Sequence, residues 1–213
     1  MSLLQVALDF LHIKDALNIA SLTYQYIDII EAGTPLIKSE GVRVVETLKK
    51  NFQEKNIFAD LKIMDTGALE AKMAFDAGAD LISVCAQASV ETITGAIEET
   101  RRQNKKIVID LIGSRDWLYR SREIQYLKPD FFCIHISLDE QRKCKKTFSG
   151  LENYTKEIQI PFCIAGGIKP EDIPLIMPFQ PFIIIVGGYI IKAEKPDEAA
   201  KTIKEAIINW KPQ

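Results

Sequence analysis

Short apolar segments recur along the whole chain, and polar residues do not alternate with the apolar ones inside them. They are rich in isoleucine, valine and phenylalanine. This pattern favours strands that are covered on both faces, as in a parallel sheet. The eight segments are residues 4–8, 27–31, 57–62, 81–85, 106–111, 131–135, 162–165 and 183–186.

The stretches between these segments carry apolar residues at helical spacing instead. The clearest predicted helices are residues 41–51, 66–77, 89–104 and 196–210, with Ser89 as an N-cap. Strand and helix alternate eight times, and no glycine- or serine-rich linker interrupts them. This order is typical of an α/β chain that forms a single (β/α)8 TIM barrel over residues 1–213, although a doubly wound sheet also uses such units.

Composition and charge argue against nucleic acid and membranes as partners. The net charge is −2 over 213 residues, and 47% of the residues are hydrophobic, enough for a large core. No apolar run approaches the ~20 residues that cross a bilayer, and the N-terminus has no secretory signal pattern. The four cysteines have no C-x-x-C spacing, so we expect buried free thiols and a cytoplasmic protein.

Candidate chemistry begins with the sequence Ala-Asp-Leu-Lys-Ile-Met-Asp at residues 59–65. In an extended strand, Asp60 and Lys62 point to one face, with Leu61 on the other. Asp65 follows on the loop. Charged residues inside a strand are seldom found unless they are paired or bind a ligand. The segment therefore predicts either a structural ion pair or a catalytic group of charges.

Polar residues also end several other predicted strands. Asp9, Glu31, Asp110 and His135 all lie at or just after a strand end. The C-terminal ends of the strands form the active site of a (β/α)8 barrel, so these side chains are expected to converge there. In that setting His135 is a candidate for acid–base catalysis, with a buried, hydrogen-bonded histidine as the alternative.

Glu31 and Asp60 end neighbouring strands and both present carboxylate oxygens. Such a pair suits Mg²⁺, which commonly binds one or two protein carboxylates and fills its other positions with water and substrate. The spacing fits a second arrangement equally well, in which one carboxylate acts as a base and the other pairs with Lys62.

Glycine pairs end the last two predicted strands. Gly166 and Gly167 follow Ala165, and Gly187 and Gly188 follow the final strand. Glycine lets a backbone with free N–H groups approach a phosphate closely. The loops after strands seven and eight often bind phosphate in this fold. We therefore predict that these residues bind the phosphate of a small-molecule substrate.

Taken together, these motifs resemble the orotidine 5′-monophosphate decarboxylase superfamily over essentially the whole chain. Within it, the chain is similar to the family of 3-hexulose-6-phosphate synthase and 3-keto-L-gulonate-6-phosphate decarboxylase. The segments that carry the resemblance are Leu-Asp at 8–9, Ile-Glu-Ala-Gly-Thr-Pro at 30–35, Asp-Leu-Lys-Ile-Met-Asp-Thr-Gly at 60–67, Ala-Gly-Ala-Asp at 77–80, Ile-Ala-Gly-Gly-Ile at 164–168 and Val-Gly-Gly at 186–188.

The resemblance implies a Mg²⁺-dependent aldolase that joins D-ribulose 5-phosphate and formaldehyde, reversibly, into D-arabino-hex-3-ulose 6-phosphate through an enediolate. It places Mg²⁺ on Glu31 and Asp60, and it gives Lys62 the role of stabilising the enediolate. It makes His135 the group that transfers the proton at carbon, while Asp9 orients Lys62 or the substrate hydroxyls.

The resemblance also implies a homodimer with shared active sites, because in this family the residue matching Asp65 reaches into the neighbouring subunit. Four positions favour the synthase over the decarboxylase. They are Asp110, Leu138, Ala165 and Gly188, where the decarboxylase typically has Glu, Arg, Thr and Arg. The loop after His135 departs from the synthase pattern. The alternatives are the decarboxylase reaction and, in another class, a barrel that binds a phosphosugar without turnover.

Overall fold

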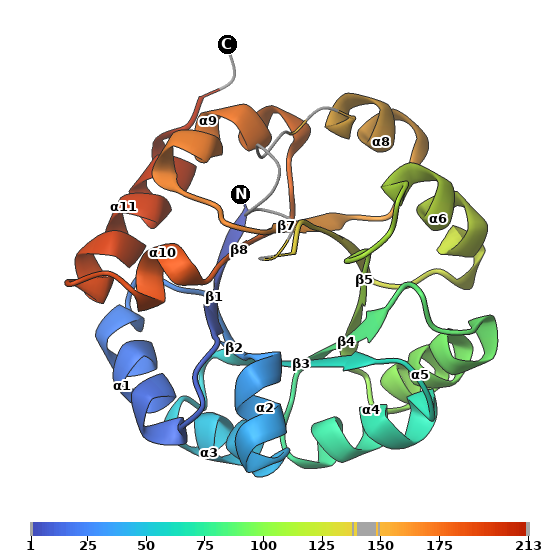
Figure 1. Cartoon of the computed structure of the whole chain (residues 1–213), viewed down its shortest axis with the longest axis horizontal. Coiled ribbons are helices and arrows are strands. Elements are labelled where there is room, and N and C mark those ends of the chain that lie inside the picture. Colours follow the sequence, from blue (N-terminus) through green and yellow to red (C-terminus); the bar gives the residue numbers. More distant parts are fainter. Residues whose placement is uncertain (1, 138, 140–147, 149, 212–213) are drawn as a thin grey trace.

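Eight parallel strands form a closed barrel in the computed structural model, and helices surround it (Figure 1). The structure describes residues 2–137, 139, 148 and 150–211. The strands are β1 (Leu3–Leu8), β2 (Ile29–Ala32), β3 (Asn56–Ile63), β4 (Leu81–Cys85), β5 (Lys106–Asp110), β6 (Phe131–His135), β7 (Phe162–Ala165) and β8 (Ile183–Val186). They pair in chain order, and β1 also pairs with β8. The predicted (β/α)8 barrel is confirmed.

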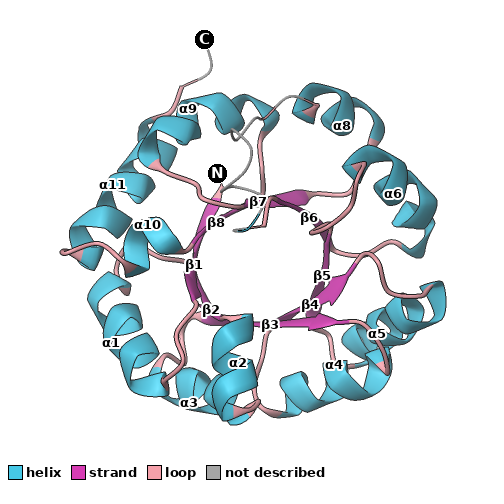
Figure 2. Cartoon of the chain, in the orientation of Figure 1, coloured by secondary structure: helices cyan, strands magenta, loops and turns pink. Residues whose placement is uncertain are grey.

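Helices cover the outer face of this ring on every side (Figure 2). The α-helices are α1 (Ile13–Thr23), α2 (Thr34–Glu40), α3 (Arg43–Asn51), α4 (Gly67–Asp76), α5 (Val90–Arg102), α6 (Trp117–Ile124), α8 (Leu151–Glu157), α9 (Ile173–Ile176), α10 (Gly188–Ile191) and α11 (Pro196–Asn209). The 3-10 helices are η1 (Gln125–Leu127), η2 (Pro170–Asp172) and η3 (Met177–Phe179).

The four helices predicted from apolar spacing are present, with ends shifted by one or two residues. Ser89 is the N-cap of α5, as predicted, because its hydroxyl accepts a hydrogen bond from the N–H of Thr92. The short helices α2 and α10 were not predicted. Each has too few residues for an apolar period to be visible, and each follows a strand end that carries candidate site residues.

Residues two apart on a strand share a face, and this places the polar strand ends inside the barrel. The inner apolar layer consists of Ile29, Phe58, Leu81, Val108, Phe131, Cys133, Cys163, Ala165 and Ile183. Two residues beyond five members of this layer lie Glu31, Asp60, Ser83, Asp110 and His135. The barrel interior is therefore closed by apolar side chains and becomes polar toward the C-terminal ends of the strands.

The three cysteines in the described part of the chain are buried free thiols, as predicted: Cys85, Cys133 and Cys163. Cys144 lies outside the described residues. None of the helices that the structure describes has the length and apolar character needed to span a membrane.

Candidate active site

The centre of the polar interior is the ammonium group of Lys62. Its Nζ lies 2.8 and 3.0 Å from the two carboxylate oxygens of Asp60 and 3.0 Å from Oδ2 of Asp110. Asp60 and Asp110 are only 7% and 3% exposed, so these ion pairs are largely shielded from solvent. The structure thus joins the ends of β3 and β5 through one cation.

This arrangement fixes the charges of the groups involved. Burial alone would lower the pKa of Lys62, but the Asp60 and Asp110 carboxylates raise it well above its usual range. Burial alone would raise the pKa of Asp110, but the hydrogen bond from His135 and the charge of Lys62 hold that pKa at about 2. At neutral pH the lysine is therefore an ammonium and Asp110 a carboxylate.

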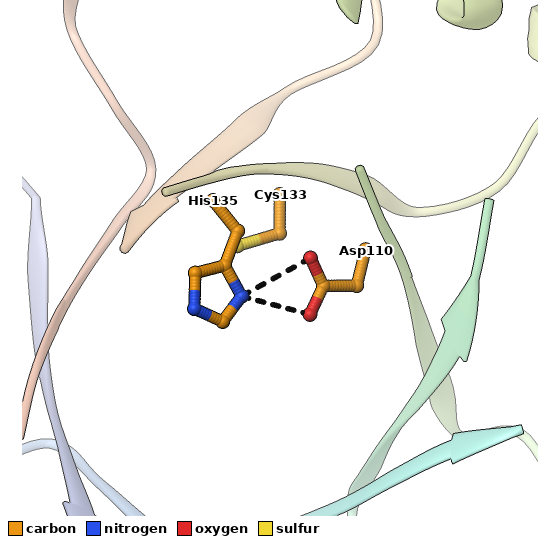
Figure 3. Close-up of side chains that lie close together, drawn as sticks. All are labelled: Asp110, Cys133 and His135. Atoms are coloured by element: carbon orange, nitrogen blue, oxygen red, sulfur yellow. Dashed lines mark hydrogen bonds and ion pairs between the residues drawn. The ribbon is translucent and has the colours of Figure 1, made fainter. Parts of the chain in front are cut away.

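His135 lies on the other side of Asp110, at the end of β6. Its Nδ1 is 2.9 Å from Oδ2 and 3.2 Å from Oδ1 of Asp110 (Figure 3). Since Asp110 is ionised, Nδ1 carries the hydrogen in this contact, and the neutral ring then has its lone pair on Nε2. Nε2 points away from Asp110 into the barrel interior (Figure 3). This geometry suits a base that accepts a proton from a ligand inside the barrel.

Cys133 completes a compact group, because one ligand atom from each of Asp110, Cys133 and His135 lies within 4.8 Å of the others (Figure 3). Burial raises the pKa of the Cys133 thiol well above its usual range, so it keeps its proton. The thiolate is the form that binds metals, and Asp110 is already occupied by Lys62 and His135. This group therefore fits an acid–base pair better than a cation site.

A different set of carboxylates has the chemistry of a cation site. Burial, followed by repulsion from Asp60 and Asp9, raises the pKa of Glu31 well above its usual range. Burial and the Asp60 charge also raise the pKa of Asp9. Repelling carboxylates around a single ammonium leave an excess of negative charge that a divalent cation would offset. The donor set at Glu31 and Asp60 therefore fits Mg²⁺.

The partner of Glu31 supports the same conclusion. The buried amide of Gln5 donates from Nε2 to Oε2 of Glu31 at 2.6 Å, which favours the carboxylate form. The opposite end of that amide has no partner, and Gln5 Oε1 is the one such buried side-chain atom among the described residues. Leaving a buried acceptor unpaired costs about 1–3 kcal/mol. The Gln5 amide therefore orients Glu31 although its own oxygen has no hydrogen-bond partner.

The two glycine pairs differ in how strictly they need glycine. Gly166 has φ +111°, and a Cβ there would lie 2.4 Å from the carbonyl oxygen of Ile136. Gly167 also has a positive φ, +62°. Gly187 precedes α10 and Gly188 is its first residue, and a Cβ on Gly188 would meet nothing within 4 Å. The fold therefore requires glycine at 166, whereas the space around position 188 is open.

Asp65 does not join the charge network. It is exposed after β3, and its Oδ1 accepts a hydrogen bond from the N–H of Thr66. Large apolar side chains close to it in the sequence are also exposed: Met64 at 52%, Leu69 at 59% and Met73 at 48%. This surface has the composition of one that a protein partner covers.

Lys62 lies in β3, as predicted, but its backbone is not extended. Lys62 has φ +48°, and the pairing of β3 with β4 shifts register between Ala59 and Ile63. The side chain nevertheless reaches Asp60, so the predicted ion pair is present. A positive φ is unfavourable for lysine. It arises here because the chain turns at Lys62 and so brings the side chain inward from a bulge.

Three further residues that touch the charged groups were not predicted. Thr34 donates from Oγ1 to Oδ2 of Asp60 at 2.7 Å, and Ser83 donates to Oδ1 of Asp60 at 2.6 Å. Gln5 binds Glu31, as described above. Gln5 and Ser83 are polar residues inside apolar strand segments, and that exception to the pattern was the signal that could have found them.

Comparison with known proteins identifies the family to which this barrel belongs. Residues 2–203 match the family model described as orotidine 5′-phosphate decarboxylase / HUMPS family. The chain belongs to this family. The prediction from the sequence motifs is therefore confirmed.

Relatives within the orotidine 5′-phosphate decarboxylase / HUMPS family align with nearly the whole chain. A 3-hexulose-6-phosphate synthase of Mycobacterium gastri is 42% identical, covering 96% of this chain and 99% of its own. A crystal structure of 3-hexulose-6-phosphate synthase has a TM-score of 0.92 at 42% identity, with coverage of 96% and 99%. These relatives carry the name of an aldehyde-lyase, the enzyme class predicted from the sequence.

The second activity considered above is also represented among similar structures. A 3-keto-L-gulonate-6-phosphate decarboxylase of Vibrio cholerae has a TM-score of 0.88 at 32% identity, covering 99% of each chain. Both branches therefore share this barrel, and the choice between them depends on individual site residues. Of the four deciding positions, Leu138 lies outside the described residues.

The shared ammonium leads to a prediction about pH. Replacing Lys62 with Met removes one positive charge beside buried Asp110 but keeps the hydrogen bond from His135, so the pKa of Asp110 should rise from about 2. A ¹³C NMR titration of the aspartate carboxyl groups measures this. Lys201→Met, at a half-exposed position on α11, is the control and should leave the Asp110 pKa unchanged.

The same shift has a consequence for acid stability. Because the folded-state pKa of Asp110 lies below its unfolded-state value, ionised Asp110 stabilises the wild-type fold above about pH 4. That contribution is lost as the pH falls toward 2. An Asp110 pKa that stays near 2 in Lys62→Met would contradict the charge network described here.

Proposed function

We propose that the protein catalyses the reversible condensation of D-ribulose 5-phosphate with formaldehyde to D-arabino-hex-3-ulose 6-phosphate. The observation that carries the proposal is the network in which Lys62 bridges Asp60 and Asp110 while Asp110 orients His135. It combines a fixed cation with a base, as required to form and stabilise an enediolate. The names of the relatives support the choice of substrates.

The substrate phosphate is expected at the two glycine loops after β7 and β8. The positive φ angles of Gly166 and Gly167 and the open space at Gly188 favour close approach of an anion to main-chain N–H groups. These loops lie at the same end of the barrel as Lys62 and His135. Holding the phosphate there would direct C1 and C2 of the ketose into the polar interior.

His135 is proposed to remove a proton from C1 of ribulose 5-phosphate. Its Nδ1–H is held by ionised Asp110, so Nε2 is the available lone pair. The electrons of the broken C–H bond form the C1–C2 double bond of the enediolate, and negative charge collects on the C2 oxygen. Asp110 then stabilises the protonated imidazole that results.

The enediolate charge is proposed to be stabilised by Lys62, whose pKa keeps it cationic throughout. Glu31 and Asp60 would hold Mg²⁺, which as a Lewis acid would stabilise the enediolate oxygens. C1 then forms a bond with the carbon of formaldehyde while the C1–C2 double bond reverts to the C2 carbonyl, and the formaldehyde oxygen takes up the proton held by the His135 imidazolium. Asp9, directly after β1, is proposed to orient substrate hydroxyls.

The charge of the site favours the synthase over the decarboxylase. Among the described residues, Lys62 is the one ammonium group that contacts the buried network, and both its partners are carboxylates. Ala165 and Gly188 offer no side-chain donor where the decarboxylase typically has Thr and Arg, so a substrate carboxylate would have fewer partners here. Neutral formaldehyde needs no such partner.

We also propose that the enzyme is a homodimer in which Asp65 completes the active site of the neighbouring subunit. The support is that Asp65, Met64, Leu69 and Met73 are all exposed. Asp65 does not join the charge network of its own subunit. Analytical ultracentrifugation should show a dimer, and Met73→Asp should shift it to monomer with loss of activity. A wild-type protein that is monomeric and active would remove Asp65 from the site.

The proposed reaction is tested by two assays in parallel, each with Mg²⁺. We expect formaldehyde consumption with ribulose 5-phosphate and no more than slight CO₂ release from 3-keto-L-gulonate 6-phosphate. Dominant CO₂ release would make the protein a decarboxylase instead. No turnover in either assay, together with tight binding of ribulose 5-phosphate, would identify a non-catalytic phosphosugar-binding barrel.

A further inference from the structure

The bulge at the end of β3 is opposite a single residue of β4. Ala59 pairs with Ile82 and Ile63 pairs with Val84, so residues 60–62 of β3 face Ser83 alone. The two strands are neighbours in the barrel wall (Figure 1). A bulge removes backbone groups from the regular ladder, and here the residue with the unusual backbone, Lys62, is also the one whose ammonium organises the site.

The hydroxyl of Ser83 takes the place of the missing ladder contact. The backbone N–H of Lys62 donates to Ser83 Oγ at 2.9 Å, and Ser83 is only 1% exposed. Without this acceptor, the amide would be a buried donor with no partner, which folded proteins rarely tolerate. The contact therefore stabilises the left-handed conformation of Lys62.

The same hydroxyl also reaches the carboxylate of Asp60. Because Ser83 Oγ accepts the Lys62 N–H, its own hydrogen is free for Oδ1 of Asp60 at 2.6 Å. The other oxygen of Asp60 accepts from Thr34 Oγ1 at 2.7 Å. Two hydroxyls thus hold the carboxylate from both sides, and only Ser83 connects it to the backbone of Lys62.

We propose that Ser83 is a positioning residue that fixes the Asp60 carboxylate and the Lys62 ammonium relative to each other. This rests on the proposed function, in which Asp60 holds Mg²⁺ and Lys62 stabilises the enediolate. Ser83 itself does not contact the substrate. Without the Ser83 hydroxyl, Asp60 can rotate and the backbone at Lys62 can relax. The Mg²⁺ proposed at Asp60 and the Lys62 ammonium then lose their fixed relative position.

The test compares Ser83→Ala with Ser83→Thr and with Thr34→Val. Loss of a group that orients a metal ligand typically costs about 10- to 100-fold in metal affinity or activity. Ser83→Ala should therefore lower kcat by that factor and weaken Mg²⁺ binding in calorimetry, with a smaller change in KM for ribulose 5-phosphate. Ser83→Thr keeps the hydroxyl and should restore both quantities.

Hydrogen exchange of the Lys62 amide separates this role from a general loss of stability. Exchange should be slow in the wild type, in Ser83→Thr and in Thr34→Val, which removes an Asp60 contact but not the amide acceptor. It should be fast in Ser83→Ala, with no acceleration at other amides of β3. A Ser83→Ala variant that keeps kcat, Mg²⁺ affinity and slow Lys62 exchange within about twofold would overturn the proposal.

Failure of the proposed function gives a different result. In that case the wild type itself shows no Mg²⁺-dependent consumption of formaldehyde. The exchange of the Lys62 amide still reports whether Ser83 fixes the backbone of β3, since that measurement needs neither substrate nor metal.

Discussion

The ammonium of Lys62, held between two buried carboxylates, is the interaction on which the site depends. An ion buried without a partner costs several kcal/mol, so Asp60, Lys62 and Asp110 are stable in the barrel only together. Their contacts of 2.8–3.0 Å provide that compensation. In turn, the low pKa of Asp110 allows it to orient His135, which connects the ion pair to proton transfer.

The Lys62 ammonium does not neutralise all the carboxylates in the barrel interior. The excess of negative charge bears directly on the proposed chemistry. Glu31 and Asp9 add negative charge beside Asp60, and burial together with repulsion from neighbouring carboxylates raises the pKa of each. A barrel that served only as a stable scaffold would replace such repelling carboxylates with apolar residues. Their presence together supports the proposal that a divalent cation and an anionic intermediate complete the site.

Much of the fold was predictable because strands buried on both faces leave continuous apolar segments in the sequence. The convergence of Glu31, Asp60, Asp110 and His135 followed from the same pattern, since residues at strand ends of a barrel must meet. The left-handed backbone of Lys62 was not predictable in this way. It depends on Ser83, which is 21 positions away. A polar residue inside an apolar segment marks Ser83 as unusual, but the sequence does not show which backbone group its hydroxyl contacts.

The position of Asp65 shows a second limit of the sequence. The sequence predicts Asp65 on the loop after Lys62, and the structure has it exposed there next to exposed Met64. A single chain contains no information on what covers such a surface unless the composition of the patch is considered. By contrast, the glycine pairs were informative because the strain at Gly166 excludes other residues locally.

The central claim is that a divalent cation completes the charge balance at Glu31 and Asp60. Isothermal titration calorimetry with Mg²⁺ on EDTA-treated protein tests it most directly, with Glu31→Gln as the variant and Glu46→Gln, on the exposed face of α3, as its control. The account predicts one site per subunit in the wild type and in the control, lost in Glu31→Gln. Full turnover by the EDTA-treated wild type, without Mg²⁺ binding, would contradict it.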